Sequence, residues 1–277
     1  MFKLLDAGFS RMKKSKVSIL LLIYTIGIAL FMLYTQYSDM KEYGETIIIH
    51  QLFVNSITII GAVIAVFICL FIGTEYSDGT LRNKIIVGAS RIKIYLSNLI
   101  IVSITTLLSE ILYLIIIAII GIPIFGGLNM SLGNFALIFV DIIGIIFVFS
   151  AIFTFISMLV SNKTISVIVS IALFFAFMII SVTLFSRIEA PEYREVAKIV
   201  DAETQEIEVV TEKNPRYLTE EKRNLYETIL NFIPQGQAFL VAGRADTDFE
   251  KLPLYALSAI IIITVIGMYL FNKKELI

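Results

Sequence analysis

The sequence predicts an all-α integral membrane protein with six transmembrane helices and a small extracellular α+β insertion between the fifth and the sixth. Hydrophobic residues make up 58% of the 277 residues and charged residues only 16%. A soluble fold does not bury that much apolar surface, whereas lipid accepts it. The apolar residues also fall into runs of about 20, which cross a hydrocarbon core of roughly 30 Å at 1.5 Å per helical residue.

Six apolar runs have the length of a membrane span. The predicted spans are residues 17–37, 50–72, 94–120, 134–160, 165–186 and 252–271. The glycines and the proline of residues 121–127 predict that the third span ends at Gly121. We assign residues 17–186, which contain the first five spans, to one unit. Residues 252–277 contain the sixth span and the C-terminal end.

Lysine and arginine are unevenly distributed among the connecting segments. The segments before span one, between spans two and three, between four and five, and after six carry the basic residues Lys3, Arg11, Lys13, Lys14, Lys16, Arg82, Lys84, Arg91, Lys93, Lys163, Lys273 and Lys274. The two short loops on the other side contain only Lys41. Basic residues are retained in the cytoplasm during insertion. We therefore predict a multi-pass protein of the plasma membrane with both termini in the cytoplasm.

Residues 1–16 alternate apolar and basic side chains. This pattern predicts an amphipathic helix on the inner leaflet, where its cations face anionic lipid headgroups. The alternative is a basic flank that only sets the orientation of the first span.

Residues 187–251 form the one sizeable polar segment. Its first half is acidic, and residues 198–210 show two β-rich arms around a polar turn, which predicts a hairpin. Residues 218–232 have helical apolar spacing and are followed by a short apolar helix. No catalytic combination of side chains occurs here, so we interpret the segment as a lid, a recognition surface or a solvated cap.

Motifs for catalysis and cofactor binding are absent from the sequence. It has no G-x-x-x-x-G-K-[ST] phosphate loop and no H-E-x-x-H pair. Cys69 and His50 are single residues of their kinds, which excludes an intrachain disulfide and a Cys/His metal cluster. We predict no catalytic, metal or cofactor site, and no nucleic-acid partner.

Two acidic residues fall inside predicted spans, Glu110 in the third and Asp141 in the fourth. An acid at the bilayer centre costs roughly 2.5–3.5 kcal/mol, so both side chains are expected to face the bundle or a wet cavity. They are candidates for a proton or substrate relay, or for interhelical hydrogen bonds. The structural alternative is stronger for Asp141, which lies nearer the outer edge.

The polar turn between spans two and three, residues 74–92, has the features of a short helix. Asp78 or Thr80 is a candidate cap, and Leu81 and Ile85 share one face. Gly88 suits a left-handed helix end. The turn is therefore either an amphipathic helix that enters a groove on a cytosolic partner, or a solvated connection.

These residues resemble the permeases of ABC-2 type transporters. Residues 73–84 (GTEYSDGTLRNK) and 88–91 (GASR) are similar to the family signature E-Y-x-x-G-T-x-R-x-K…G-x-S-R. Residues 231–238 (NFIPQGQA) are similar to its N-F-x-P-x-G-Q-A element before the last span. The resemblance implies a coupling helix that docks on a separate soluble ATPase. The residues implied in coupling are Glu75, Tyr76, Gly79, Thr80, Arg82, Lys84 and Arg91.

The resemblance also implies what such a chain does. It is expected to be the membrane subunit of an exporter for hydrophobic or amphipathic peptides, such as toxins, bacteriocins or antimicrobial peptides. A second permease copy, expected to be identical, and an ATPase that binds ATP and magnesium would complete the unit, surrounded by lipid. Two alternatives stay open: a proton-coupled transporter that uses Glu110 and Asp141, and a membrane receptor or scaffold.

Overall fold

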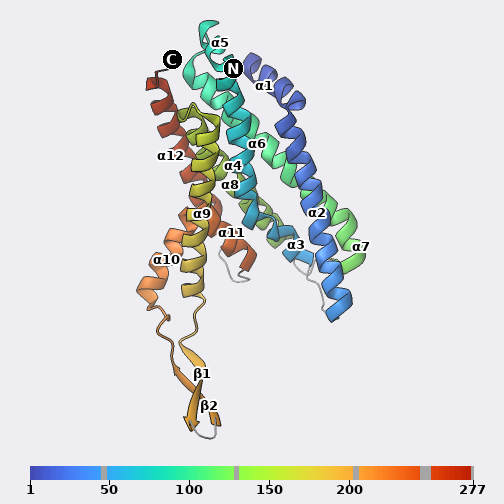
Figure 1. Cartoon of the computed structure of the whole chain (residues 1–277), viewed down its shortest axis with the longest axis vertical. Helices are drawn as coiled ribbons and strands as arrows, with labels where there is room; N and C mark the ends of the chain where they lie inside the picture. The colour runs from blue at the N-terminus through green and yellow to red at the C-terminus, as the bar shows by residue number, and fades with distance from the viewer. Residues whose placement is uncertain (45–48, 128–130, 202–205, 244–250, 276–277) are drawn as a thin grey trace.

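The protein is an elongated bundle of long helices with both chain ends at the same end of the bundle (Figure 1). The computed structural model describes residues 1–44, 49–127, 131–201, 206–243 and 251–275. Within them, 6 helical segments are long and apolar enough to cross a membrane, which confirms the predicted fold class. They are α2 (Lys16–Tyr43), α3 with α4 (Ile49–Asn55, Ile57–Ser77), α6 (Arg91–Ile116) with its extension to Phe125, α8 (Leu132–Leu159), α9 (Lys163–Ile188) and α12 (Leu252–Lys273).

The ends of three predicted spans are wrong. Helix α2 continues past residue 37 to Tyr43, where Gly44 ends it with a φ of 68°. The third span does not stop at Gly121. It passes through the π-helical turn η1 (Ile117–Gly121) into α7 (Ile122–Phe125), because Pro123 stands in the first turn of α7, where no N–H is needed. The second span is interrupted after α3 and then extends to Ser77.

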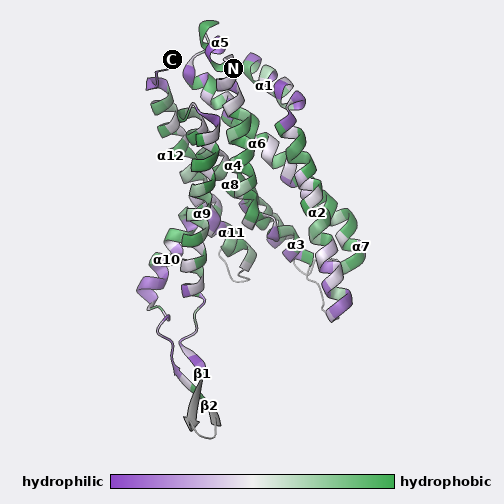
Figure 2. Ribbon diagram, viewed as in Figure 1, coloured by the Kyte–Doolittle hydropathy of each residue, from purple (hydrophilic) through white to green (hydrophobic). Residues whose placement is uncertain are grey.

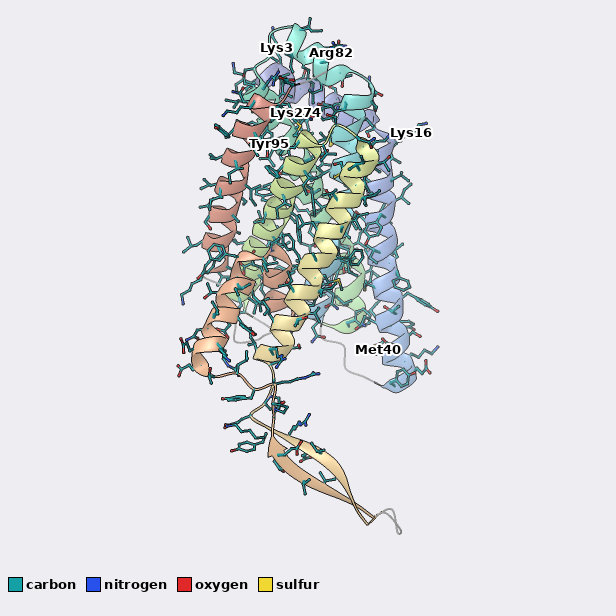
Figure 3. The ribbon with its side chains drawn as sticks, turned by 60° about the vertical axis from the view of Figure 1, so that its left-hand side comes forward. Lys3, Lys16, Met40, Arg82, Tyr95 and Lys274 are labelled. Carbon is teal, nitrogen blue, oxygen red and sulfur yellow. The ribbon has the colours of Figure 1, made fainter. Side chains whose placement is uncertain are left out.

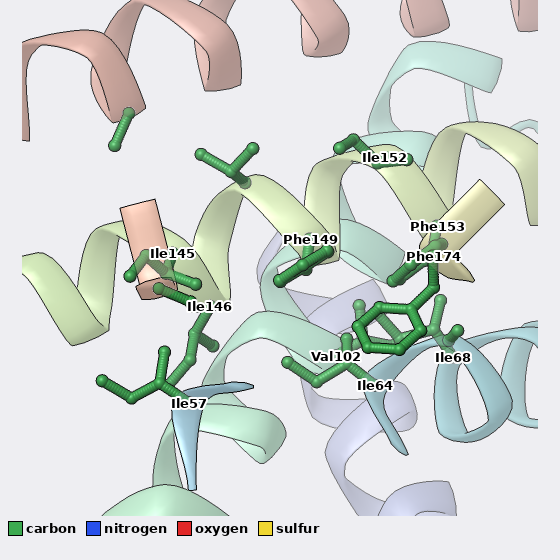
Figure 4. Close-up of a cluster of buried hydrophobic side chains, with 14 of the residues drawn as sticks. Ile57, Ile64, Ile68, Val102, Ile145, Ile146, Phe149, Ile152, Phe153 and Phe174 are labelled. Atoms are coloured by element: carbon green, nitrogen blue, oxygen red, sulfur yellow. The ribbon is translucent and has the colours of Figure 1, made fainter. Parts of the chain in front are cut away.

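Helix α4 lies at the centre of the bundle and packs mainly against α8 and α9, while α12 packs against α8. Figure 4 shows the buried isoleucines and phenylalanines where these helices meet. The stacked rings of Phe149 and Phe153 have centroids 5.6 Å apart. A Cβ atom on Gly61 would lie 2.7 Å from the rings of both Phe149 and Phe174. The glycine therefore permits the close approach of α4 to α8 and α9.

Helix α2 lies at the edge of the bundle, against α6. Its buried residues follow one narrow helical stripe, Ser18, Leu21, Thr25, Ala29 and Leu33. Its other faces expose apolar side chains, which appear green in Figure 2. Such a surface is stable in contact with lipid but not with water.

The opposite end of the bundle carries the polar insertion (Figure 2). Strands β1 (Tyr193–Asp201) and β2 (Glu206–Lys213) pair antiparallel, with Val196 opposite Val210. This confirms the predicted hairpin, whose arms are longer than expected; its predicted turn, 202–205, lies outside the described residues. Two helices follow, α10 (Glu220–Phe232) and α11 (Pro234–Gly243), of which α11 packs on α9 and α8.

The N-F-x-P-x-G-Q-A element acts as a structural joint between α10 and α11. Gln237 Nε2 donates to the carbonyl of Asn231 (2.6 Å), and Gln235 Nε2 donates to the carbonyl of Thr58 in α4 (2.8 Å). A Cβ atom on Gly236 would lie 2.4 Å from the backbone oxygen of Leu230. The element therefore fixes the insertion to the membrane bundle, and its glycine is required by close backbone contact.

We expect Gly236→Ala to lower the thermal unfolding midpoint of the detergent-purified protein, because the added methyl group meets backbone that cannot move away as a side chain would. The expected loss is about 1–3 kcal/mol, as for other overpacked sites. Gly27→Ala is the matched control, since a Cβ atom there has nothing within 4 Å. Equal midpoints for the two variants would contradict this interpretation of the joint.

Candidate functional site

The polar segment between α4 and α6 lies at the end of the bundle that holds both termini. Figure 3 shows Lys3, Arg82 and Lys274 together at this end and Met40 at the other. Within the segment, α5 (Thr80–Ile86) is a separate short helix. Its predicted cap by Asp78 or Thr80 is wrong: Gly79 occupies the N-cap position, with a φ of 67° and no side-chain cap.

Glu75 is the centre of a buried polar network that joins four parts of the chain. It is only 1% exposed. Its Oε1 atom accepts from Lys84 of α5 and pairs with Arg11 Nη1 of the N-terminal helix α1 (Phe2–Lys14) at 2.5 Å. Its Oε2 atom accepts from Asn98 Nδ2 of α6 at 2.9 Å. One carboxylate at the end of α4 thus connects α1, α5 and α6.

Arg11 is held between this carboxylate and an aromatic ring. Its guanidinium carbon lies 4.0 Å from the centroid of the Phe71 ring, a cation–π contact. Burial lowers the pKa of Arg11, and the nearby charges of Glu75 and Asp78 oppose that shift. Arginine stays charged in proteins, so Glu75 is the counterion that makes its partial burial tolerable.

Helix α1 also packs directly on the bundle. A Cβ atom on Gly8 would meet the side chain of Ile101 in α6 at 2.0 Å, so the two helices are in close contact. The apolar side chains of α1, including Leu5 and Phe9, pack against the core. The predicted amphipathic helix therefore buries its apolar face on α6 and is tied to Glu75, instead of resting on lipid alone.

A second contact set joins the C-terminal end to the same segment. Tyr76 donates its hydroxyl to the carbonyl of Met158. Lys274 Nζ lies 2.9 Å from that hydroxyl and 3.1 Å from the same carbonyl. Arg91 donates to the backbone carbonyls of Asn272 and Lys274. Burial lowers the pKa of Lys274 to about 8.

Helix α5 turns its predicted apolar stripe inward, which corrects the expectation that Leu81 and Ile85 face a partner. Leu81 is buried in the main core and Ile85 packs beside it. The side chains that point away from the bundle come from the other face. Ile86 is 74% and Val87 is 87% exposed, and Arg82 is exposed beside them. This exposed face is called the α5 tip below.

The residues of the signature thus divide into three groups. Glu75, Tyr76, Thr80, Lys84 and Arg91 make contacts within the chain, with Thr80 donating to the backbone oxygen of Glu75 at 3.2 Å. Gly79 and Gly88 supply positive φ angles, and Ser90 caps α6. Only Arg82 belongs to the exposed face. Asn98 was missed by sequence reasoning, although an asparagine inside an apolar run was a usable signal.

The two intramembrane acids occupy separate environments. Glu110 is 3% exposed, and its Oε1 atom accepts from Ser56 Oγ at 2.7 Å, at the interruption between α3 and α4. Asp141 of α8 is also buried, and neither of its oxygens has a hydrogen-bond partner within the described residues. Asp141 does not line the cavity next to Glu110. The structure does not bring them together as one relay.

The candidate site lies within the part of the chain that matches a known protein family. Residues 4–181 match the sequence model described as ABC-2 family transporter protein, which is more than half of the chain. The chain belongs to this family. It is therefore the membrane-spanning component of an ABC transporter, and membership implies a partner ATPase. Among curated proteins, none matches this ABC-2 permease.

The match to the ABC-2 family includes the Glu75 network, α5 and both intramembrane acids. It ends within α9, before the hairpin and the N-F-x-P-x-G-Q-A joint. The family match therefore does not include the polar insertion of this ABC-2 permease.

Proposed function

We propose that this chain is the permease subunit of an ATP-driven exporter for hydrophobic or amphipathic peptides, such as a toxin, bacteriocin or antimicrobial peptide. A separate ATPase binds the α5 tip and supplies the force, and the bundle alternates between inward and outward access. One observation carries this proposal. Helix α5 exposes its tip on one side, and the buried carboxylate of Glu75 holds it to the bundle on the other.

The contacts of α5 support a path for that force. Lys84 links α5 to Glu75, and Glu75 links α4 to α1 through Arg11 and to α6 through Asn98. Displacement of α5 would therefore move three helices together rather than bend a free loop. The basic residues at this end support a cytoplasmic position for α5 and for both termini.

The remaining parts of the proposal concern partners and cargo. Two copies of this chain form the pathway with two ATPase subunits, and the ATPase binds ATP and magnesium. The apolar, lipid-exposed surface of α2 supports an apolar cargo that reaches the bundle from the membrane. On this view the hairpin and α10 lie outside the cell.

The decisive experiment combines purification with transport. We expect the chain, expressed with P-loop ATPases from its source genome, to co-purify one of them. Proteoliposomes of that complex should then move a fluorescent amphipathic peptide when ATP and magnesium are supplied. A proton-coupled carrier, the second candidate, would instead transport under a pH gradient without an ATPase. Transport of that kind, or no ATPase association, would contradict the proposal.

A further inference from the structure

A small recess that contains one acid and several hydroxyls lies where α2, α6 and the junction between α3 and α4 meet. Its cavity volume is about 30 Å³, which is enough for a small hydrogen-bonding group. Its hydroxyl lining includes Ser56, which donates to Glu110, and Thr25 and Ser109, whose oxygens lie 2.5 Å apart. The recess therefore presents one carboxylate and several hydroxyls within a largely apolar wall.

An apolar groove between α2 and α4 adjoins this recess. Its free space is about 450 Å³, and its lining runs from Val17 and Leu20 to Leu70. The groove and the recess share four lining residues, Leu21, Tyr24, Ile59 and Val63. Leu20 and Ile59 are exposed, so the groove is open at the surface of the bundle. A long apolar chain in the groove would therefore place its head at the recess.

The recess holds an acid without a matching protein cation. Glu110 is almost fully buried, and its one described side-chain partner is the hydroxyl of Ser56. Among the described residues that line the recess and the groove, none is Lys, Arg or His. Acids in membrane spans are costly and are usually paired. Charge complementarity therefore favours a ligand that brings the cation itself.

We infer that the recess is a subsite for a primary ammonium group whose apolar chain lies in the α2–α4 groove. Glu110 and the hydroxyls of Ser56 and Tyr24 provide acceptors for its three N–H donors. Because this inference rests on the proposed function, it narrows the cargo to cationic amphiphiles, with a lysine or N-terminal amine entering the recess. A trimethylammonium head carries the same charge but has no N–H donor to offer these acceptors.

The absence of tryptophan from the sequence permits a direct binding test. Leu20→Trp places a single reporter at the rim of the groove, in the full chain in phosphatidylcholine nanodiscs. The probes are three twelve-carbon chains with the same nitroxide quencher and different heads: a primary amine, an alcohol and a trimethylammonium. We expect the amine to quench at a concentration at least tenfold lower than the other two. Equal quenching by amine and trimethylammonium would overturn the subsite, because charge alone would then explain the binding.

Variants test the part played by the carboxylate. Glu110→Gln should remove the preference for the amine over the alcohol, while Asp141→Asn, a buried acid outside the recess, should keep it. A preference that survives Glu110→Gln would overturn the inference. So would a reporter that no probe quenches, as expected if a second copy of the chain fills the groove. This assay needs neither ATPase nor ATP, so its failure is distinguishable from failure of the proposed function.

Discussion

Glu75→Gln is expected to abolish ATP-driven transport while the ATPase still binds. Glu75 is 1% exposed, so it cannot itself form the surface that a partner touches. Its loss leaves Arg11 and Lys84 facing each other without their shared counterion. Breaking a buried ion pair on one side costs about 3–5 kcal/mol, and the partial exposure of both cations places this site at the low end. We expect transport to fall below about a tenth of the wild-type rate, while the amount of ATPase that co-purifies stays near normal.

The charges around Glu75 offer two controls. Asp78→Asn removes an exposed carboxylate three residues away, whose charge acts on Arg11 only from a distance. It should change transport and the unfolding midpoint much less than Glu75→Gln does. The double variant Arg11→Gln with Glu75→Gln should be more stable than Glu75→Gln alone, since it removes one of the unpaired cations. If Glu75→Gln instead lost the ATPase completely and kept its unfolding midpoint, the role would be direct docking and the network would be incidental.

The membrane architecture could be predicted because lipid imposes a simple rule on sequence. A span needs about 20 apolar residues, and runs of that length identified all six spans. Their ends were less certain, since polar residues such as those before Gly44 continue a helix until a glycine permits the left-handed turn. The hairpin was visible because β-branched residues flank a polar turn, a local signal.

The polar network could not be predicted in the same way. Arg11, Glu75 and Asn98 are far apart in the chain, and their meeting depends on how α1 and α6 pack against α4. Sequence reasoning therefore assigned Glu75 and Lys84 to a partner's surface, where the structure pairs them with each other. The inward rotation of Leu81 was unpredictable for a similar reason. A seven-residue amphipathic helix has one apolar face, and periodicity does not say whether that face meets its own bundle or another protein.

The α5 tip provides the second large expected effect. The double substitution Ile86→Asp with Val87→Asp should weaken ATPase association at least 100-fold. Burial of one isoleucine or valine contributes about 1.5–3 kcal/mol, so losing two such contacts removes roughly 3–6 kcal/mol from the interface. Because both side chains are mostly exposed in the isolated chain, the substitutions should not lower its unfolding midpoint. Association would be measured by titrating purified ATPase against the permease in nanodiscs.

The opposite end of the molecule supplies the matched control for this prediction. Val209 is an exposed β-branched residue of the hairpin, far from α5 (Figure 1). Val209→Asp should leave ATPase association unchanged, because on the proposed orientation the hairpin lies on the other side of the membrane. If Val209→Asp weakened association as strongly as the α5 substitutions, the ATPase would have to bind at the hairpin end. The basic residues near α5 would then face outward, against the retention of cations in the cytoplasm.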